Sequence, residues 1–199
     1  LEVSEDQLAR AWYLAQALLA AESLGAVEAT LEMSVQYAKE RFTFGRAIGS
    51  YQAIKHGLTE ILRRQENARS LLYYAGWAFE DGPEQFALAA SAARSAAGSA
   101  LDFASRQNIT THGGIGATWE HDAPLFFRRA QLFRRLLGGA GDATDRVAAE
   151  LFAQCFEVAA YGPIDGAFVA NAIGGALSGG SPAALEAAFA VLWWAHMVI

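Results

Sequence analysis

Hydrophobic residues recur at intervals of three and four along most of this chain, a spacing that places them on one face of an α-helix. Near the start, such a stripe is formed by Leu24, Val27, Leu31 and Val35. Ser4 and Gln7 have the pattern of a capping box, in which each side chain bonds the backbone N–H of the other. The first helix is therefore expected to begin just after Ser4 and to continue to about Arg41.

The same spacing predicts four further helices, over residues 51–79, 83–106, 123–137 and 142–154. The core side of the second helix is expected to comprise Ile54, Leu58, Ile61, Leu62, Leu72 and Ala75. The third helix is rich in alanine, which favours helix formation and lets neighbouring helices approach closely. Pro83 suits the first turn of that helix, because its missing N–H would have no partner there.

No stretch alternates between apolar and polar residues for long enough to predict a β-sheet. Long helices joined by short connectors favour an all-α fold, an antiparallel helical bundle over residues 1–153. Residues 154–199 differ, since glycine and proline divide them into short apolar helical runs. This apolar helical tail of unknown role could pack on the bundle, cover a partner surface or be a non-native extension.

The composition is that of a globular protein, with 53% hydrophobic and 18% charged residues in a chain of 199. A net charge of −6 argues against a general nucleic-acid surface. One cysteine and four histidines, without the spacing of metal ligands, predict no metal site.

The chain opens on Leu1, without the basic and apolar regions of a signal peptide, and this start suggests a fragment. No uninterrupted apolar run reaches the ~18 residues of a membrane helix. We therefore expect a cytoplasmic protein with no membrane span.

The connector between the first two predicted helices, Arg41-Phe42-Thr43-Phe44-Gly45, carries the main candidate chemistry. Arg41 offers a planar, permanently charged group suited to phosphate, and Gly45 permits a tight backbone path. Taken by composition alone, the connector is better explained as a helical hairpin in which Arg41 caps the last carbonyls of the first helix.

Two motifs, taken together, instead favour a functional role for this connector. Arg41-Phe42-Thr43-Phe44-Gly45 with Tyr51-Gln52, and the later segment from His112-Gly113-Gly114 to Trp119-Glu120, resemble the C-terminal helical domain of the acyl-CoA dehydrogenase family. Both occur in the family's order and at about its spacing, and the resemblance covers residues 8–151. It implies a helical bundle that uses FAD to dehydrogenate an acyl-CoA between its α and β carbons.

In this family the connector contacts the FAD of a neighbouring subunit, and the glycine pair approaches the adenosine-diphosphate end. The resemblance therefore implies a cross-subunit FAD half-site. Its cofactor-binding residues would be Arg41, Phe42, Thr43, Phe44, Tyr51, Gln52, Thr110, Gly113 and Gly114. Thr110 is a departure, because the family usually has glutamine three residues before the first glycine.

The larger departure concerns the catalytic base, a glutamate that removes the proton α to the thioester while a hydride passes to the flavin. The usual base position matches Leu137, which cannot accept a proton. An alternative family position on the first helix matches Ala15, which is also inert. We therefore expect no catalytic residue in this chain, and interpret Glu22 and Glu28 as surface carboxylates.

Some bacterial members of the family are heteromeric and pair a base-bearing subunit with one that lacks the base. This sequence resembles such base-lacking subunits, which implies a homo- or hetero-oligomer with another acyl-CoA dehydrogenase-type subunit and no activity for this chain alone. The alternative is a non-catalytic helical dimerisation module that no longer binds flavin.

Overall fold

The structure is a computed structural model that describes residues 4–161, with side chains described as far as residue 152. The chain divides into two units, Leu1–Val147 and Ala148–Ile199. Most of the predicted apolar tail lies outside the described residues, so its role and the predicted boundary at residue 153 stay predictions.

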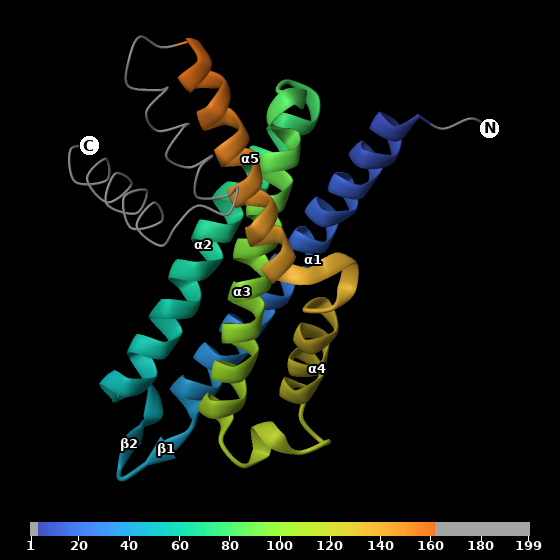
Figure 1. Cartoon of the computed structure of the whole chain (residues 1–199). Coiled ribbons are helices and arrows are strands. Elements are labelled where there is room, and N and C mark those ends of the chain that lie inside the picture. The colour runs from blue at the N-terminus through green and yellow to red at the C-terminus, as the bar shows by residue number, and fades with distance from the viewer. Residues whose placement is uncertain (1–3, 162–199) are drawn as a thin grey trace, which may run out of the picture. The chain divides into compact units, whose positions relative to one another are not determined.

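Five α-helices account for nearly all of the described chain, and the predicted all-α fold is confirmed. They are α1 (Glu5–Glu40), α2 (Gln52–Glu80), α3 (Phe86–His112), α4 (Ala123–Phe133) and α5 (Gly139–Tyr161). The three long helices α1, α2 and α3 lie side by side, and α4 lies beside them at the lower end in Figure 1. Short connectors make successive long helices antiparallel.

Local sequence signals set several helix ends. The capping box at the start of α1 is present, with the Ser4 side chain accepting from the Gln7 backbone and Gln7 bonding in return. Pro83 opens a 3₁₀ turn, Pro83–Gln85, which leads into α3. The predicted start of the third helix at Pro83 is therefore a 3₁₀ turn rather than α-helix.

Several predicted helix ends are wrong, and α5 runs from Gly139 to Tyr161 rather than over residues 142–154. The third helix continues six residues past Arg106, to His112. In its final turn the Thr110 and Thr111 hydroxyls donate to carbonyls of the same helix. The helix ends at Gly113, whose φ is 65°. The fourth ends at Phe133 rather than at Leu137, since Leu137, Gly138 and Gly139 all have positive φ. Positive φ at three successive positions is incompatible with a right-handed helix.

The first connector contains a two-residue antiparallel ladder that the sequence did not predict, in which β1 (Phe42–Thr43) pairs with β2 (Arg46–Ala47). Phe44 and Gly45 make the turn with φ of 51° and 78°. Positive φ at both central residues is the signature of a tight hairpin turn. The ladder is too short for an alternating sequence pattern to reveal it.

The core is built from small side chains, as the alanine-rich sequence predicted. On α3, the alanines that lie at most 1% exposed are Ala89, Ala90, Ala93, Ala97, Ala100 and Ala104. The facing side of α1 buries small polar residues that the hydrophobic pattern did not identify, namely Ser23, Thr30 and Ser34. Leu62 of α2 is 47% exposed, so its predicted place in the core is wrong. Small residues on both helices permit close approach.

Within the described residues, α1 contains an 18-residue window that is long and apolar enough to cross a membrane, with mean hydropathy 1.2. The core helix of a helical bundle has the same length and composition, and α1 packs along α3. The expected absence of a membrane span stays a prediction.

Candidate functional site

The β1–β2 hairpin presents a cation and two aromatic rings at one end of the bundle. The Arg41 carbonyl accepts from the Ile48 backbone over 2.8 Å, which closes the base of the hairpin. The Arg41 side chain is exposed, and among the described residues it has no hydrogen-bond or ion-pair partner. Phe42 and Phe44 are 64% and 93% exposed. Exposed rings beside an unpaired guanidinium are suited to a planar or phosphorylated ligand.

Tyr51 and Arg46 hold the hairpin in place. The Tyr51 hydroxyl donates to the Thr43 carbonyl over 3.0 Å, and the Arg46 guanidinium lies 4.0 Å above the Tyr51 ring. The structure thus gives Tyr51 a supporting contact inside the hairpin. Gln52, the next residue after Tyr51, is the first residue of α2 and is exposed.

The Gly113–Gly114 segment follows the end of α3 and is open to its surroundings. Gly113 has a φ of 65°, a conformation that favours glycine. Gly114 has an ordinary helical φ of −54°, and a Cβ added there would meet nothing within 4 Å. Neither backbone strain nor packing within the described chain requires glycine at position 114. A close approach by a ligand from outside would require it.

Thr110 lies one turn before this segment and is exposed. Its hydroxyl donates to the Arg106 carbonyl over 3.0 Å. The shorter threonine side chain is thereby folded back onto its own helix, whereas a longer amide would extend further from it. Thr110, at the position where the family usually has glutamine, therefore also differs from glutamine in how far its side chain extends from the helix.

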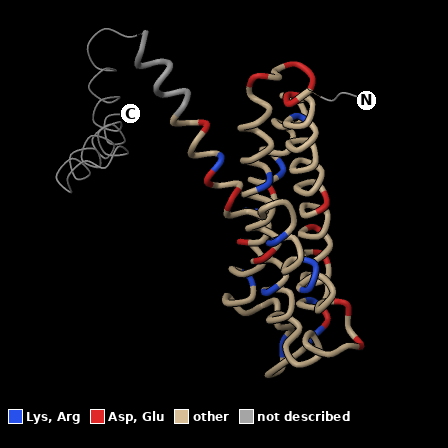
Figure 2. Tube along the Cα trace, turned by 45° about the vertical axis from the view of Figure 1, so that its right-hand side comes forward, with Lys and Arg blue, Asp and Glu red and all other residues tan. Residues whose placement is uncertain are grey.

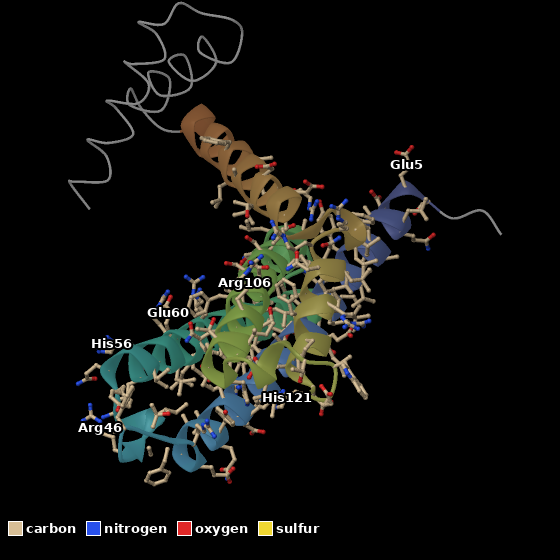
Figure 3. The ribbon with its side chains drawn as sticks, turned by 90° about the horizontal axis from the view of Figure 1, so that it is seen from below. Glu5, Arg46, His56, Glu60, Arg106 and His121 are labelled. Carbon is tan, nitrogen blue, oxygen red and sulfur yellow. The ribbon has the colours of Figure 1, made fainter. Side chains whose placement is uncertain are left out.

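The hairpin and the glycine segment lie at the same end of the bundle. The ends of α1 and α3 are joined by a 2.8 Å hydrogen bond from the Ser34 hydroxyl to Asn108 Oδ1 and by contact of the Tyr37 and His112 rings. Figure 3 views the molecule from this end and labels Arg46 of the hairpin and His121 of the following loop. The two groups of sequence-predicted cofactor residues, Arg41–Gln52 and Thr110–Gly114, are thus brought to one end of the bundle.

The turn at residues 137–139 lies further along the bundle, away from the hairpin. It contains Leu137, the position matched to the usual base, and it contacts the neighbour of Ala15, the position matched to the alternative base. Gln16 of α1 is fully buried, and its Nε2 donates to the Leu137 carbonyl over 3.0 Å. Ala15 is the neighbour of Gln16 in the chain. The positions matched to the usual and the alternative base are therefore close in space, and neither side chain can accept a proton.

A buried arginine supports the same turn. Arg94 of α3 is 0% exposed, and its Nη2 donates to the carbonyls of Phe133 over 2.6 Å and Leu136 over 3.2 Å. These are carbonyls at the end of α4 and just beyond it, where a cation is favourable. Burial and the nearby charge of Arg146 lower the pKa of Arg94. Among the described residues no carboxylate pairs with it.

Several carboxylates elsewhere form ion pairs on the surface. Hydrogen bonds from Arg63 and Arg64 lower the pKa of Glu60 to about 2. Burial opposes ionisation of Asp102, but hydrogen bonds from Arg106 and Gln131 keep its pKa below the usual range. Glu22 pairs with Arg129, and Glu28 lies near Arg69. Figure 2 shows positive and negative residues interspersed along the coloured trace, without one dominant basic face.

A family model describing the acyl-CoA dehydrogenase C-terminal domain matches residues 10–152. The chain belongs to the acyl-CoA dehydrogenase family. The predicted resemblance is confirmed, and it covers the bundle, the hairpin and the glycine segment.

Among curated members of the family, acyl-CoA dehydrogenase IpdE2 of Mycobacterium tuberculosis is 41% identical over 135 residues, 68% of this chain and 41% of that protein. Acyl-CoA dehydrogenase FadE34 of the same organism is 41% identical over 150 residues, 75% of this chain and 21% of that protein. The chain therefore spans less than half the length of these relatives.

Solved acyl-CoA dehydrogenase structures share the fold. The ChsE4–ChsE5 complex of Mycobacterium tuberculosis matches with a TM-score of 0.70 at 28% identity, over 74% of this chain and 40% of that one. The G363A variant of the Tcur3481–Tcur3483 steroid acyl-CoA dehydrogenase (ACAD) matches with a TM-score of 0.72 at 28% identity, over 76% of this chain and 42% of that one. This acyl-CoA dehydrogenase domain is thus related to subunits of heteromeric enzymes.

The motifs identified the hairpin and glycine residues, but not the buried groups behind them. The buried Gln16 and Arg94 have no motif of their own in this sequence. One signal was present for Arg94, which is the only charged residue in the alanine-rich run from Phe86 to Leu101. A single cation within such a run is costly to bury unless its donors are used.

Proposed function

We propose that this chain contributes a cross-subunit FAD half-site to an acyl-CoA dehydrogenase and lacks a catalytic base of its own. The observation that carries the proposal is that Arg41, which has no partner among the described residues, and the exposed Phe42 and Phe44 lie at the same end of the bundle as the open Gly114 backbone. Family membership supports FAD as the ligand.

The residues present fit a dinucleotide pyrophosphate. Arg41 would supply a charge-assisted contact to a phosphate, and the Gly113–Gly114 backbone would let a phosphate or sugar approach closely. Phe42 and Phe44 offer apolar rings for a flat part of the same ligand. When bound, FAD would supply the hydride acceptor for α,β-dehydrogenation of an acyl-CoA.

The absence of a base assigns the proton-abstracting step to another chain. Leu137 and Ala15 occupy the two family positions, and Glu22 is already paired with Arg129. We therefore propose assembly with an acyl-CoA dehydrogenase-type subunit that carries the glutamate. The solved relatives ChsE4–ChsE5 and Tcur3481–Tcur3483 support a heteromeric assembly of this kind.

The test measures flavin binding by the assembled flavoprotein. Arg41→Ala is expected to raise the dissociation constant for FAD about 10- to 100-fold, because a hydrogen bond to a charged group contributes roughly 1.5–3 kcal/mol. Arg63→Ala is the matched control, since Arg63 binds Glu60 on the solvent face of α2. Equal affinities in the two variants would remove Arg41 from the site.

A helical dimerisation module that no longer binds flavin is the second candidate. It is favoured by Thr110, whose hydroxyl is bonded to Arg106 rather than projecting from the helix. Protein purified with its partner subunit would then be colourless and without a flavin absorbance band. A yellow complex that loses its colour in Arg41→Ala would exclude this candidate.

A further inference from the structure

The loop between α3 and α4 is bounded by two histidines that contact each other. His112 ends α3 and His121 precedes α4, and their ring centroids are 4.4 Å apart. The ring of Tyr37 on α1 lies 4.3 Å from the ring of His112. Aromatic contacts therefore link α1, α3 and the segment that enters α4, close to the Gly113–Gly114 backbone.

The hydrogen bond made by His121 requires a neutral ring. Its Nδ1 accepts from the backbone N–H of Ala123 over 3.0 Å, so Nδ1 carries no proton. Nδ1 of His112 lies 2.8 Å from the Asn108 carbonyl oxygen, which can only accept, so this nitrogen carries the proton. Geometry thus determines the tautomer of both rings in their neutral forms.

The Ala123 N–H is the first backbone donor of α4, and it depends on His121. Ala123 is 0% exposed, and Nδ1 of His121 is its acceptor among the described residues. Pro124 has no N–H, and Leu125 donates to the Asp122 carbonyl over 2.9 Å. No side chain of Asp122 caps this helix. His121 is therefore the side chain that closes the start of α4.

We propose that His121 is a positioning residue: when neutral it holds the start of α4 through Ala123 and, through its ring contact with His112, the adjoining Gly113–Gly114 segment, and when protonated it releases both. A proton on Nδ1 would remove the acceptor and leave a buried N–H unsatisfied. It would also place a cation at the positive end of α4 and against His112. The lost hydrogen bond and the unfavourable position of the charge would both favour release of the segment.

Four other titratable groups lie at this junction. Tyr37 comes from α1 and His112 from α3, while Glu120 and Asp122 flank His121 within the loop. Neither carboxylate hydrogen-bonds to an imidazole among the described residues. The short helix at Ile115–Ala117 and the first turn of α4 carry no charged side chain.

The environment of His112 also disfavours a positive charge at this junction. Burial lowers the pKa of His112, and the nearby His121 lowers it further, against the opposing hydrogen bond to Asn108. A histidine whose pKa is lower in the folded state stabilises the fold above its unfolded value of about 6.5, and that contribution is lost as the pH falls. Acidification therefore weakens the junction.

A consequence for the ligand rests on the proposed function. Because the segment carries the proposed pyrophosphate contacts of Gly113 and Gly114, its release would weaken FAD retention in mildly acidic solution. The junction itself can be measured on the chain without flavin, so the two statements are tested separately.

The first experiment measures the amide protection factor of Ala123 by hydrogen exchange and NMR at about pH 7.5 and about pH 5.5. The wild-type value is expected to fall roughly tenfold at the lower pH, as a buried donor loses its acceptor. His121→Asn retains a side-chain acceptor that does not titrate there, and should stay protected at both values. His121→Leu should be poorly protected at both.

His56→Asn is the matched control, because His56 is exposed on α2, as Figure 3 shows. It should follow the wild-type protein. An unchanged protection factor in the wild-type chain, or an equal fall in His121→Asn, would overturn the proposal.

The second experiment measures FAD retention by the assembled flavoprotein at the same two pH values. Loss of FAD at the lower pH in the wild type, but not in His121→Asn, would support the link to the ligand. If Ala123 responds to pH while FAD retention does not, the junction stands and the proposed flavin contact at Gly113–Gly114 is wrong.

Discussion

Gln16 of α1 donates a hydrogen bond from Nε2 to the carbonyl oxygen of Leu137, 121 positions further along the chain, over 3.0 Å. Nη2 of Arg146 lies 3.4 Å from Oε1 of the same side chain. Gln16 therefore joins α1 to the turn that follows α4 and to the first half of α5. This single amide therefore joins Leu137 to the neighbour of Ala15, the two positions that the resemblance matches to a catalytic base.

Gln16→Leu should destabilise the fold by about 1–3 kcal/mol, because it leaves the Leu137 carbonyl without its buried donor. Urea denaturation would show this as a lower midpoint with an unchanged slope. Gln36→Leu is the control, since Gln36 is exposed on the same helix. Equal midpoints for the two variants would mean that solvent replaces the Gln16 bond without loss.

Arg94→Met should also destabilise the protein, by about 1–3 kcal/mol, because the Phe133 and Leu136 carbonyls lose their buried donor. Arg94→Lys should lose less, since an ammonium retains donors and the favourable charge at the helix end. The same denaturation measurement compares the two. A Met variant more stable than wild type would show that the burial of an unpaired guanidinium costs more than its hydrogen bonds contribute.

Gly114→Ala should separate folding from ligand binding. Its φ suits alanine and the added Cβ meets no atom, so stability is expected to change by less than about 0.5 kcal/mol. FAD affinity of the assembled flavoprotein should nevertheless fall, because the methyl group would lie between backbone and ligand.

Gly116→Ala provides the contrasting variant. A Cβ there would lie 2.7 Å from the His112 Cβ and 2.9 Å from the Ile109 carbonyl oxygen. It should therefore destabilise the fold by about 1–3 kcal/mol. Unchanged FAD affinity in Gly114→Ala would show that no ligand approaches this backbone.

The chain alone should not oxidise any acyl-CoA, since a positioned general base contributes about 10²–10⁴-fold and neither base position carries one. Turnover would be assayed with artificial electron acceptors for the lone chain and for the complex with its base-bearing partner. Robust turnover by the lone chain would contradict the assignment of Leu137.

Leu137→Glu in the assembled complex tests the register directly. The new carboxylate would lie on the turn held by Gln16 and Arg94, and Leu137 is 36% exposed, so a ligand can reach the position. The number of sites titrated by a tight substrate analogue should then rise. A fully folded Leu137→Glu complex with an unchanged number of sites would place the missing base elsewhere.

Local sequence patterns were sufficient to predict the helical class, the order of the helices and the family. Each of these depends on local information: apolar spacing, a capping box, Pro83 at the start of a turn, and two short motifs that include Arg41 and Gly113. The sequence also predicts a set of flavin contacts, because the motifs contain these residues at consecutive or nearly consecutive positions, and that set stays a prediction. Helix ends were less accurate, since the polar final turn of α3 and the positive φ of Leu137 depend on bonds that spacing does not reveal.

Contacts between groups far apart in the chain could not be predicted in this way. Gln16 with Leu137, Arg94 with Phe133, and His112 with His121 are separated by 9 to 121 positions. Each contact involves a polar side chain whose role depends on whether it is buried and on which carbonyl or N–H it reaches. A hydrophobic pattern records which side of a helix is apolar, and it carries no information about the partner of a buried polar atom.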